Sequence, residues 1–102
     1  MEAIQVLIKK PGHEPVYREI ENSLESLQSI VGGYIEAIRF NEYLLICNEE
    51  GKLKNLPANI LYRNDIIVGN IIVCRMGEED FKSLKNYGDY MEAKRQVLEL
   101  AY

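Results

Sequence analysis

The chain has 102 residues, of which 47% are apolar and 27% charged, and its formal net charge is −4. This length predicts one globular domain spanning residues 1–102, with little room for a deep cavity. The acidic balance argues against direct nucleic-acid binding, sequence-specific or general, because that needs a basic surface to displace counterions. It leaves open a basic protein partner, or an anion pocket built from backbone N–H groups.

The N-terminal part of the chain predicts a hairpin followed by a helix. Residues 3–8 and 16–20 alternate apolar and polar side chains, and a turn with two prolines and a glycine joins them. Residues 22–31 predict a helix, because Asn-Ser precedes a glutamate at capping-box spacing and the apolar residues recur at helical spacing. Gly32 and Gly33 are expected to end it.

The middle of the chain predicts a second strand pair. Residues 34–40 and 43–47 indicate two strands joined by a tight turn, and the second is apolar enough for a central strand. After a Glu-Gly turn, residues 52–56 are expected to return as a short strand. Residues 57–61 are expected to form one helical turn, since proline is tolerated at the first helical position.

The last third of the chain predicts one strand and two helices. β-Branched residues indicate a strand at 70–74, with Gly69 marking a bulge or a close approach of the backbone. Residues 78–85 predict a short helix, and residues 89–102 a longer one that is capped by Asp89. This order of elements predicts an α+β fold, with a small, mainly antiparallel sheet and helices packed on one face.

No segment has the composition of a membrane span or a secretion signal. Residues 1–10 lack the regions of a signal peptide, and the apolar runs are far shorter than the roughly 20 residues that a span needs. We therefore expect no membrane association and an intracellular protein. In that setting Cys47 and Cys74, both inside strand-like runs, are predicted to be reduced, buried and structural.

The sequence carries no recognisable catalytic set. The only histidine, His13, lies in a turn, and with the two cysteines it makes no metal-ligand spacing. The serines stand outside any G-x-S-x-G motif, and no phosphate-binding glycine motif occurs. Neighbouring carboxylates such as Glu49 and Glu50 point in different directions, so they form no acid/base pair. We expect a protein that is not an enzyme and that needs no metal or cofactor.

The glycines next to the strands allow two interpretations. Gly32 and Gly33 form a helix cap in the first, and in the second they present backbone N–H groups to an anion. Asn48, Lys52 and Asn59 would then add amide and cationic contacts. The residues alone leave both interpretations open.

Three segments resemble a family of short proteins of unknown function that bacteriophages and conjugative mobile elements encode. They are ENSLESLQSIVGGYIEAI, LICNEEGKLKNLPAN and DIIVGNIIVCRMGEEDFKSL, and the resemblance covers about residues 3–85. The motifs V-G-G-Y-I-E, C-N-E-E-G-K-L and L-P-x-N, in this order, carry it. Ile60 stands where the family usually has an arginine, the loop at residues 61–64 is shorter than usual, and Arg63 is the nearby replacement.

The resemblance implies a biological context, the phage or mobile element, but no specific reaction or ligand. Small accessory proteins of phages and mobile elements often block immunity in the cytoplasm of the bacterial host, by binding a host defence protein or by sequestering a nucleotide second messenger. We therefore expect a non-enzymatic inhibitor of host defence. The alternative is a structural or regulatory accessory protein of a mobile element with no defence role.

Two binding modes are compatible with the residues. A nucleotide sponge, possible also at a homodimer interface, would use a pocket lined by Gly32, Gly33, Asn48, Lys52, Asn59 and Arg63. An inhibitor of a CRISPR–Cas effector such as Cas9, an anti-CRISPR protein, would fill a basic groove with an acidic surface of Glu36, Glu49, Glu50, Glu78, Glu79 and Asp80. We expect the functional surface to centre on Asn48, Glu49, Glu50 and Asn59, and not on His13 or the C-terminal helix.

Overall fold

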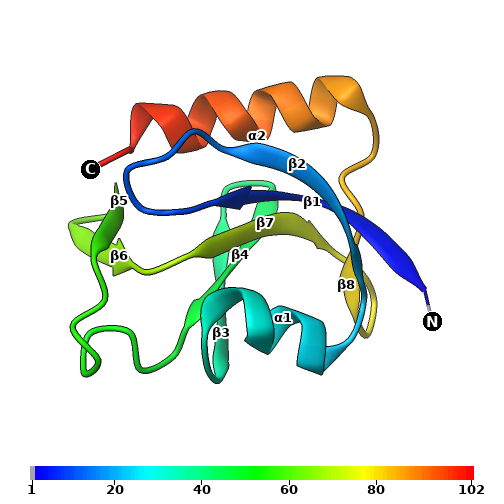
Figure 1. Cartoon of the computed structure of the whole chain (residues 1–102). Helices are drawn as coiled ribbons and strands as arrows, with labels where there is room; N and C mark the ends of the chain where they lie inside the picture. The colour runs from blue at the N-terminus through cyan, green and yellow to red at the C-terminus, as the bar shows by residue number, and fades with distance from the viewer. Residues whose placement is uncertain (1) are drawn as a thin grey trace.

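The computed structural model describes residues 2–102 and contains two helices and eight strands (Figure 1). In chain order the elements are β1 (Ala3–Lys9), β2 (Val16–Glu21), α1 (Leu24–Val31), β3 (Ile35–Phe40), β4 (Tyr43–Asn48), β5 (Ala58–Tyr62), β6 (Asp65–Val68), β7 (Ile71–Met76), β8 (Phe81–Lys82) and α2 (Tyr87–Glu99). The predicted α+β class with a mainly antiparallel sheet is confirmed.

Six strands form the main sheet, in the order β2-β1-β7-β4-β3, with β8 added to the end of β7. All pairings are antiparallel, and β7 pairs with both β1 and β4 although it is far from them in the chain. Strands β5 and β6 form a separate hairpin. The sheet therefore has two free edges, β2 and β3.

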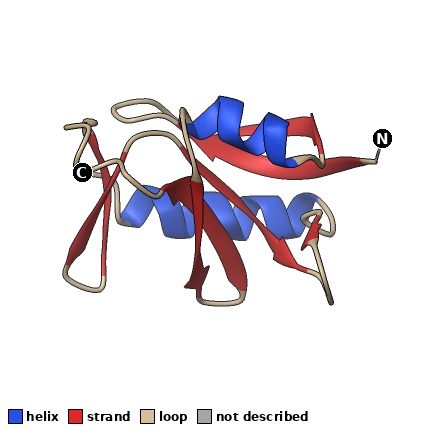
Figure 2. Cartoon of the chain, turned by 90° about the horizontal axis from the view of Figure 1, so that it is seen from below, coloured by secondary structure: helices blue, strands red, loops and turns tan. Residues whose placement is uncertain are grey.

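The two helices cover opposite faces of the sheet, which corrects the prediction of one helical face (Figures 1 and 2). Successive side chains of a strand point to opposite faces, and the central strands β4 and β7 are apolar on both. Leu45 and Val73 pack with α2, whereas Ile46 and Ile72 pack with α1. A sheet that is apolar on both faces needs a cover on each, so one helix lies on either side.

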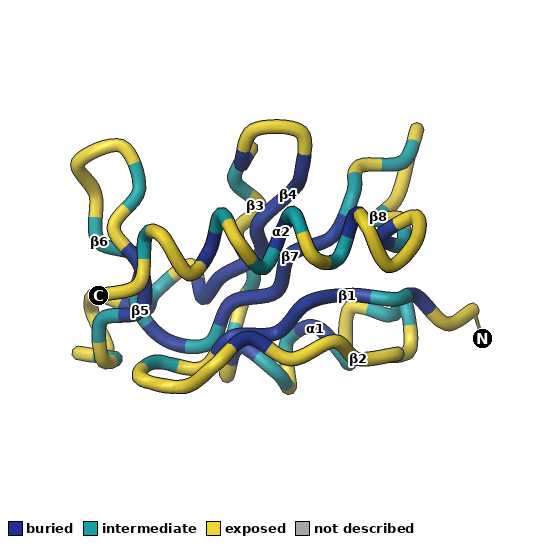
Figure 3. Tube along the Cα trace, turned by 90° about the horizontal axis from the view of Figure 1, so that it is seen from above, coloured by how far each residue is buried: buried dark blue, intermediate teal, exposed yellow. Residues whose placement is uncertain are grey.

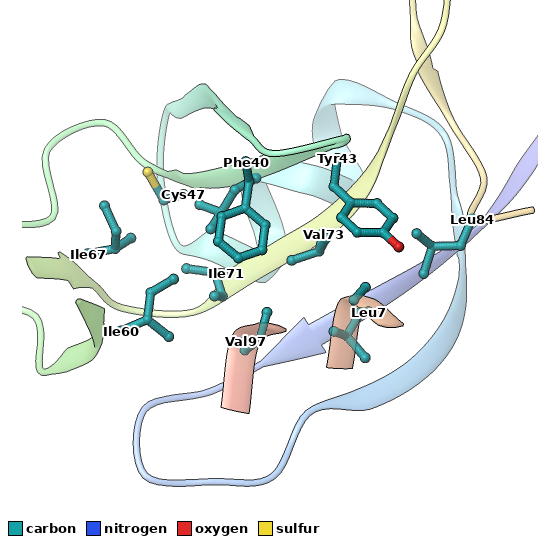
Figure 4. Close-up of a cluster of buried hydrophobic side chains, with 12 residues drawn as sticks. Leu7, Phe40, Tyr43, Cys47, Ile60, Ile67, Ile71, Val73, Leu84 and Val97 are labelled. Atoms are coloured by element: carbon teal, nitrogen blue, oxygen red, sulfur yellow. The ribbon is translucent and has the colours of Figure 1, made fainter. Parts of the chain in front are cut away.

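The larger core lies between α2, the sheet and the β5–β6 hairpin (Figure 4). Phe40 and Tyr43 are its largest side chains, and Ile60 and Ile67 from the hairpin close it at one end. Ala93 and Val97 are the buried α2 side chains in this core. The hairpin thus completes a core that α2 alone does not cover.

Residues 58–61 belong to strand β5, so the helical turn predicted at residues 57–61 does not form. The hairpin loop explains why: Tyr62 pairs with Asp65, so only Arg63 and Asn64 lie between the strands. Both have positive φ, 51° and 63°, as the favoured two-residue hairpin turn requires, and asparagine tolerates this conformation. The strand predicted at residues 52–56 is a series of turns instead.

The C-terminal third also departs from the prediction. Gly77 N–H donates to the Asp80 carbonyl at 2.7 Å, so the acidic segment turns and continues as β8 rather than as a helix. Helix α2 begins at its N-cap Asn86, whose side chain accepts from Asp89 N–H, so Asp89 lies in the first turn and not at the cap.

Candidate functional site

Four of the predicted site residues line one small hollow between the end of β4 and the β5–β6 hairpin, which we call the β4 hollow. Its volume is about 180 Å³, below the usual 300–1,000 Å³ of small-molecule pockets. Glu36 comes from the edge strand β3, opposite Cys47 of β4, and Glu49 directly follows β4. The predicted residues in its lining are Glu36, Asn48, Glu49 and Lys52.

The charges around the β4 hollow are mainly negative. Lys52 forms an ion pair with Asp65 across the hollow, which uses its ammonium group. Glu36 and Glu49 form no ion pair within residues 2–102. Two unpaired carboxylates in one hollow attract a cationic group and repel a phosphate.

Asn48 is buried, and its side chain is used inside the protein. Its Nδ2 donates to the Val31 carbonyl at 3.1 Å, and its Oδ1 accepts from Glu50 N–H at 2.8 Å. The side chain therefore ties the end of α1 to the end of β4. Only a small part of its surface, 5%, is exposed to a ligand.

Asn59 lies far inside the protein and holds the buried Lys9. Its Oδ1 accepts from Lys9 Nζ at 2.6 Å, and its Nδ2 donates to the carbonyls of Lys9 and Gly69 at 2.8 and 2.7 Å. Burial lowers the pKa of Lys9, an effect that the charge of Glu14 opposes. Asn59 is fully buried, so it offers no surface amide, contrary to its predicted place on a recognition surface.

Gly32 and Gly33 act as the C-cap of α1. Both N–H groups donate to the Gln28 carbonyl, at 2.8 and 3.1 Å, and Gly32 has the left-handed φ of 84° that this cap needs. A side chain on Gly33 would collide with Asn48 and Lys54. Both N–H groups therefore donate hydrogen bonds within the cap and are not presented to an anion.

Glu50 and Arg63 lie apart from the β4 hollow. Glu50 and Gly33 line a second hollow of about 410 Å³ beside the end of α1, together with Lys54 and Glu25. Arg63 is at the tip of the β5–β6 hairpin, where its guanidinium lies 5.3 Å from the ring centroid of Tyr62. The predicted residues thus do not converge on a single pocket.

The acidic surface proposed for a basic partner divides into two patches. Antiparallel pairing of Leu44 with Cys74 and of Ile46 with Ile72 places the end of β4 next to the start of β7. Glu36, Glu49 and Glu50 therefore lie at one end of these strands. The other acidic group, Glu78, Glu79 and Asp80, lies beyond the opposite end.

A third hollow, larger than these two, is one that the sequence did not indicate. It is a groove of about 840 Å³ between the β1–β2 hairpin and α1, which we call the β2–α1 groove. Its apolar lining includes Ile8, Ile20 and Ile30, and Lys10 and Arg18 are its lysine and arginine. The alternation of Val16, Arg18 and Ile20 on one face of a strand could have indicated one wall of this groove. The other wall is α1, so the groove itself depends on the tertiary fold.

The family model described as a domain of unknown function (DUF3846) matches residues 4–94. The chain belongs to this family. No curated protein and no solved structure matches the chain. Membership in a family of unknown function, as the sequence predicted, is confirmed, and the phage or mobile-element setting stays a prediction.

Two further findings concern this DUF3846 domain within residues 2–102. No three or more His, Cys, Asp and Glu side chains gather closely enough to hold a metal ion. Neither of its helices has the length and apolar character needed to cross a membrane. His13, the only histidine, is exposed in the turn between β1 and β2.

Both cysteines of this DUF3846 domain are free and buried, as predicted. Burial raises the pKa of the Cys47 thiol to about 11 and that of Cys74 to about 12, so neither is a thiolate near neutral pH. We expect iodoacetamide to leave the native protein unlabelled near neutral pH and to label both cysteines in urea, as read by mass spectrometry. Labelling of the native protein, or a Cys47–Cys74 disulfide, would contradict this prediction.

Proposed function

We propose that the protein is a non-enzymatic accessory protein of a phage or mobile element that inhibits a bacterial host defence by binding. Its partner is the basic surface of a nucleic-acid-handling effector, such as Cas9 of a CRISPR–Cas system. The observation that supports this proposal most is the pair of unpaired carboxylates, Glu36 and Glu49, at the β4 hollow. Effectors that hold nucleic acid expose lysine and arginine, which such carboxylates attract.

The nucleotide-sponge mode has less support, because most of its proposed donors already have partners. The N–H groups of Gly32 and Gly33 cap α1, and the amides of Asn48 and Asn59 bond inside the protein. Lys52 is paired with Asp65. Of the four proposed sponge residues that have a polar side chain, Arg63 alone forms no side-chain hydrogen bond or ion pair within residues 2–102.

A charge-neutralising pair of variants tests the acidic patch. We expect Glu36→Gln with Glu49→Gln to weaken binding to a purified Cas9–guide RNA complex roughly tenfold, and to reduce its salt dependence, because both charges steer the encounter. The measurement is biolayer interferometry at two salt concentrations. Glu78→Gln with Glu79→Gln is the matched control, since it removes the same charge at the other end of β7.

The outcomes separate the alternatives. Loss in the Glu36/Glu49 variant but not in the control supports the proposal. Equal loss in both variants would mean that net charge, and not this patch, determines binding. Absence of binding by the parent protein, together with a rise in melting temperature when a nucleotide is added, would favour the sponge.

A further inference from the structure

Strand β2 is a free edge of the main sheet, so the side of β2 away from β1 is exposed. Within residues 2–102 it pairs only with β1, and four of its six residues from Val16 onward are exposed in succession (Figure 3). Its neighbour β1 is buried along most of its length. A long exposed edge strand is a template for pairing with another extended chain unless something covers it.

The hydrogen bonds of β1 reveal which backbone groups of β2 face outward. Gln5 N–H donates to Ser83 Oγ and the Gln5 carbonyl accepts from Leu84 N–H, both at 2.9 Å, so the Gln5 backbone faces away from β2. Backbone direction alternates along a strand, so Ile4, Val6 and Ile8 face β2 instead. Their register partners on β2 are Ile20, Arg18 and Val16.

The remaining residues of β2 therefore point their N–H and C=O groups out from the edge. Two of these carbonyls have local partners, since the Arg18 guanidinium donates to the Tyr17 carbonyl at 2.9 Å and Ser23 N–H donates to that of Glu21. The N–H of Tyr17 and both backbone groups of Glu19 have no partner within residues 2–102. An added strand would satisfy them.

The β2–α1 groove lies directly beside this edge. The side chains of Val16, Arg18 and Ile20 point to the face that α1 shares, because their partners on β1 do. Helix α1 packs mainly on β3, β4 and β7, so this part of the face stays open. A strand beside β2 would place every second side chain toward the groove.

The lining of the groove indicates the chemistry of those side chains. Ile8, Ile20 and Ile30 offer an apolar surface, and Lys10 and Arg18 form no ion pair within residues 2–102. The groove also contains Glu14 and Glu19, and Glu19 already accepts a hydrogen bond from Gln5 Nε2 at 2.6 Å. Apolar side chains with an acidic one near Arg18 fit this lining best.

We propose that the edge of β2 and the β2–α1 groove bind an extended peptide of a partner protein by strand addition. The peptide presents apolar side chains to the groove, with an acidic one near Arg18. A second copy of this chain fits less well: the antiparallel register that pairs Tyr17 with Glu19 of the second copy sets Arg18 opposite Arg18, and like charges in that position destabilise a strand pair. This surface is separate from the β4 hollow, so the proposal does not rest on the proposed function.

A proline variant with a matched control tests the proposal. The Tyr17 N–H points outward, so Tyr17→Pro removes the donor and blocks an incoming strand without breaking the ladder with β1. Tyr17→Ala loses the same side chain and keeps the N–H. We expect peptides selected from a displayed library of random dodecamers to bind Tyr17→Pro on the order of tenfold more weakly than Tyr17→Ala, as read by fluorescence anisotropy.

Two further measurements keep the proposal testable if Tyr17→Pro does not fold. The selected peptides should slow amide hydrogen exchange at Tyr17 and Glu19 in the parent protein, measured by NMR. Arg18→Glu should weaken the peptides with acidic residues and strengthen versions with lysine in their place. Selection of no binder, equal binding to the two Tyr17 variants, protection elsewhere, or a dimer joined through β2 in solution would overturn the proposal.

Discussion

Asp89→Ala is expected to lower the free energy of unfolding by about 3–5 kcal/mol, because it breaks a largely buried ion pair and leaves its partners unsatisfied. Asp89 accepts from Arg75 Nε at 2.6 Å and from Arg75 Nη2 at 2.5 Å. It also accepts from Tyr43 Oη at 3.0 Å and from Lys85 N–H at 2.8 Å. This carboxylate thus joins the first turn of α2 to β7, β4 and the segment that follows β8.

Urea unfolding at neutral pH, followed by circular dichroism, measures this loss. Glu92→Ala is the matched control on the same helix, since it removes the same charge from an exposed pair with Arg95. Exposed pairs contribute little, so its effect should stay within about 1 kcal/mol. An Asp89 variant as stable as this control would show that the network contributes no net stability.

The same carboxylate predicts a loss of stability in acid. Hydrogen bonds from Arg75 hold the pKa of Asp89 at about 2, below its ordinary value of 3.8. A depressed folded-state pKa adds stability that is complete above the ordinary value and is lost as pH falls toward the folded-state value. The shift corresponds to about 2 kcal/mol, lost between about pH 4 and pH 2. Asp89→Asn should lack this part of the acid dependence.

Asn59→Ala is expected to cost roughly 2–4 kcal/mol of stability, because it removes three buried hydrogen bonds, one of them to an ammonium group. Lys9 Nζ would keep only a long contact of 3.4 Å to the Lys10 carbonyl, and the carbonyls of Lys9 and Gly69 would lose a donor. Lys9 itself is only 2% exposed. If this variant loses activity, lost stability is therefore the first explanation, ahead of a lost ligand contact.

A double-mutant cycle separates the charged hydrogen bond from the others. The double variant Lys9→Met with Asn59→Ala should lose about 1–3 kcal/mol less stability than the sum of the two single losses, because it has no unpaired ammonium group. Lys10→Met replaces Lys9→Met in the control cycle, because Lys10 is the neighbouring lysine and is exposed. Urea midpoints for the four proteins give the coupling energy. A coupling near zero would mean that Lys9 and Asn59 do not stabilise one another.

Much of the candidate site could not be predicted, because a residue's chemistry does not reveal its partner. Asn48 and Asn59 stand in a polar stretch between apolar segments, which is also typical of a surface loop. Asn59 is buried, and its side-chain oxygen accepts a hydrogen bond from Lys9, which is 50 positions earlier in the chain. Asp89 was expected to cap a helix, yet its main partner is Arg75 on a neighbouring strand.

The sequence by itself determined the elements that local signals specify. The β1–β2 hairpin, helix α1 with its glycine cap, strands β3 and β4, and the buried cysteines follow from side-chain period, caps and turn residues over a few positions. Only the tertiary structure decided the sides on which the helices pack, the extended conformation of β5 and β8, and the β2–α1 groove. Period shows which side chains are buried, whereas the neighbour that buries them is chosen by long-range pairing, such as that of β7 with β1 and β4.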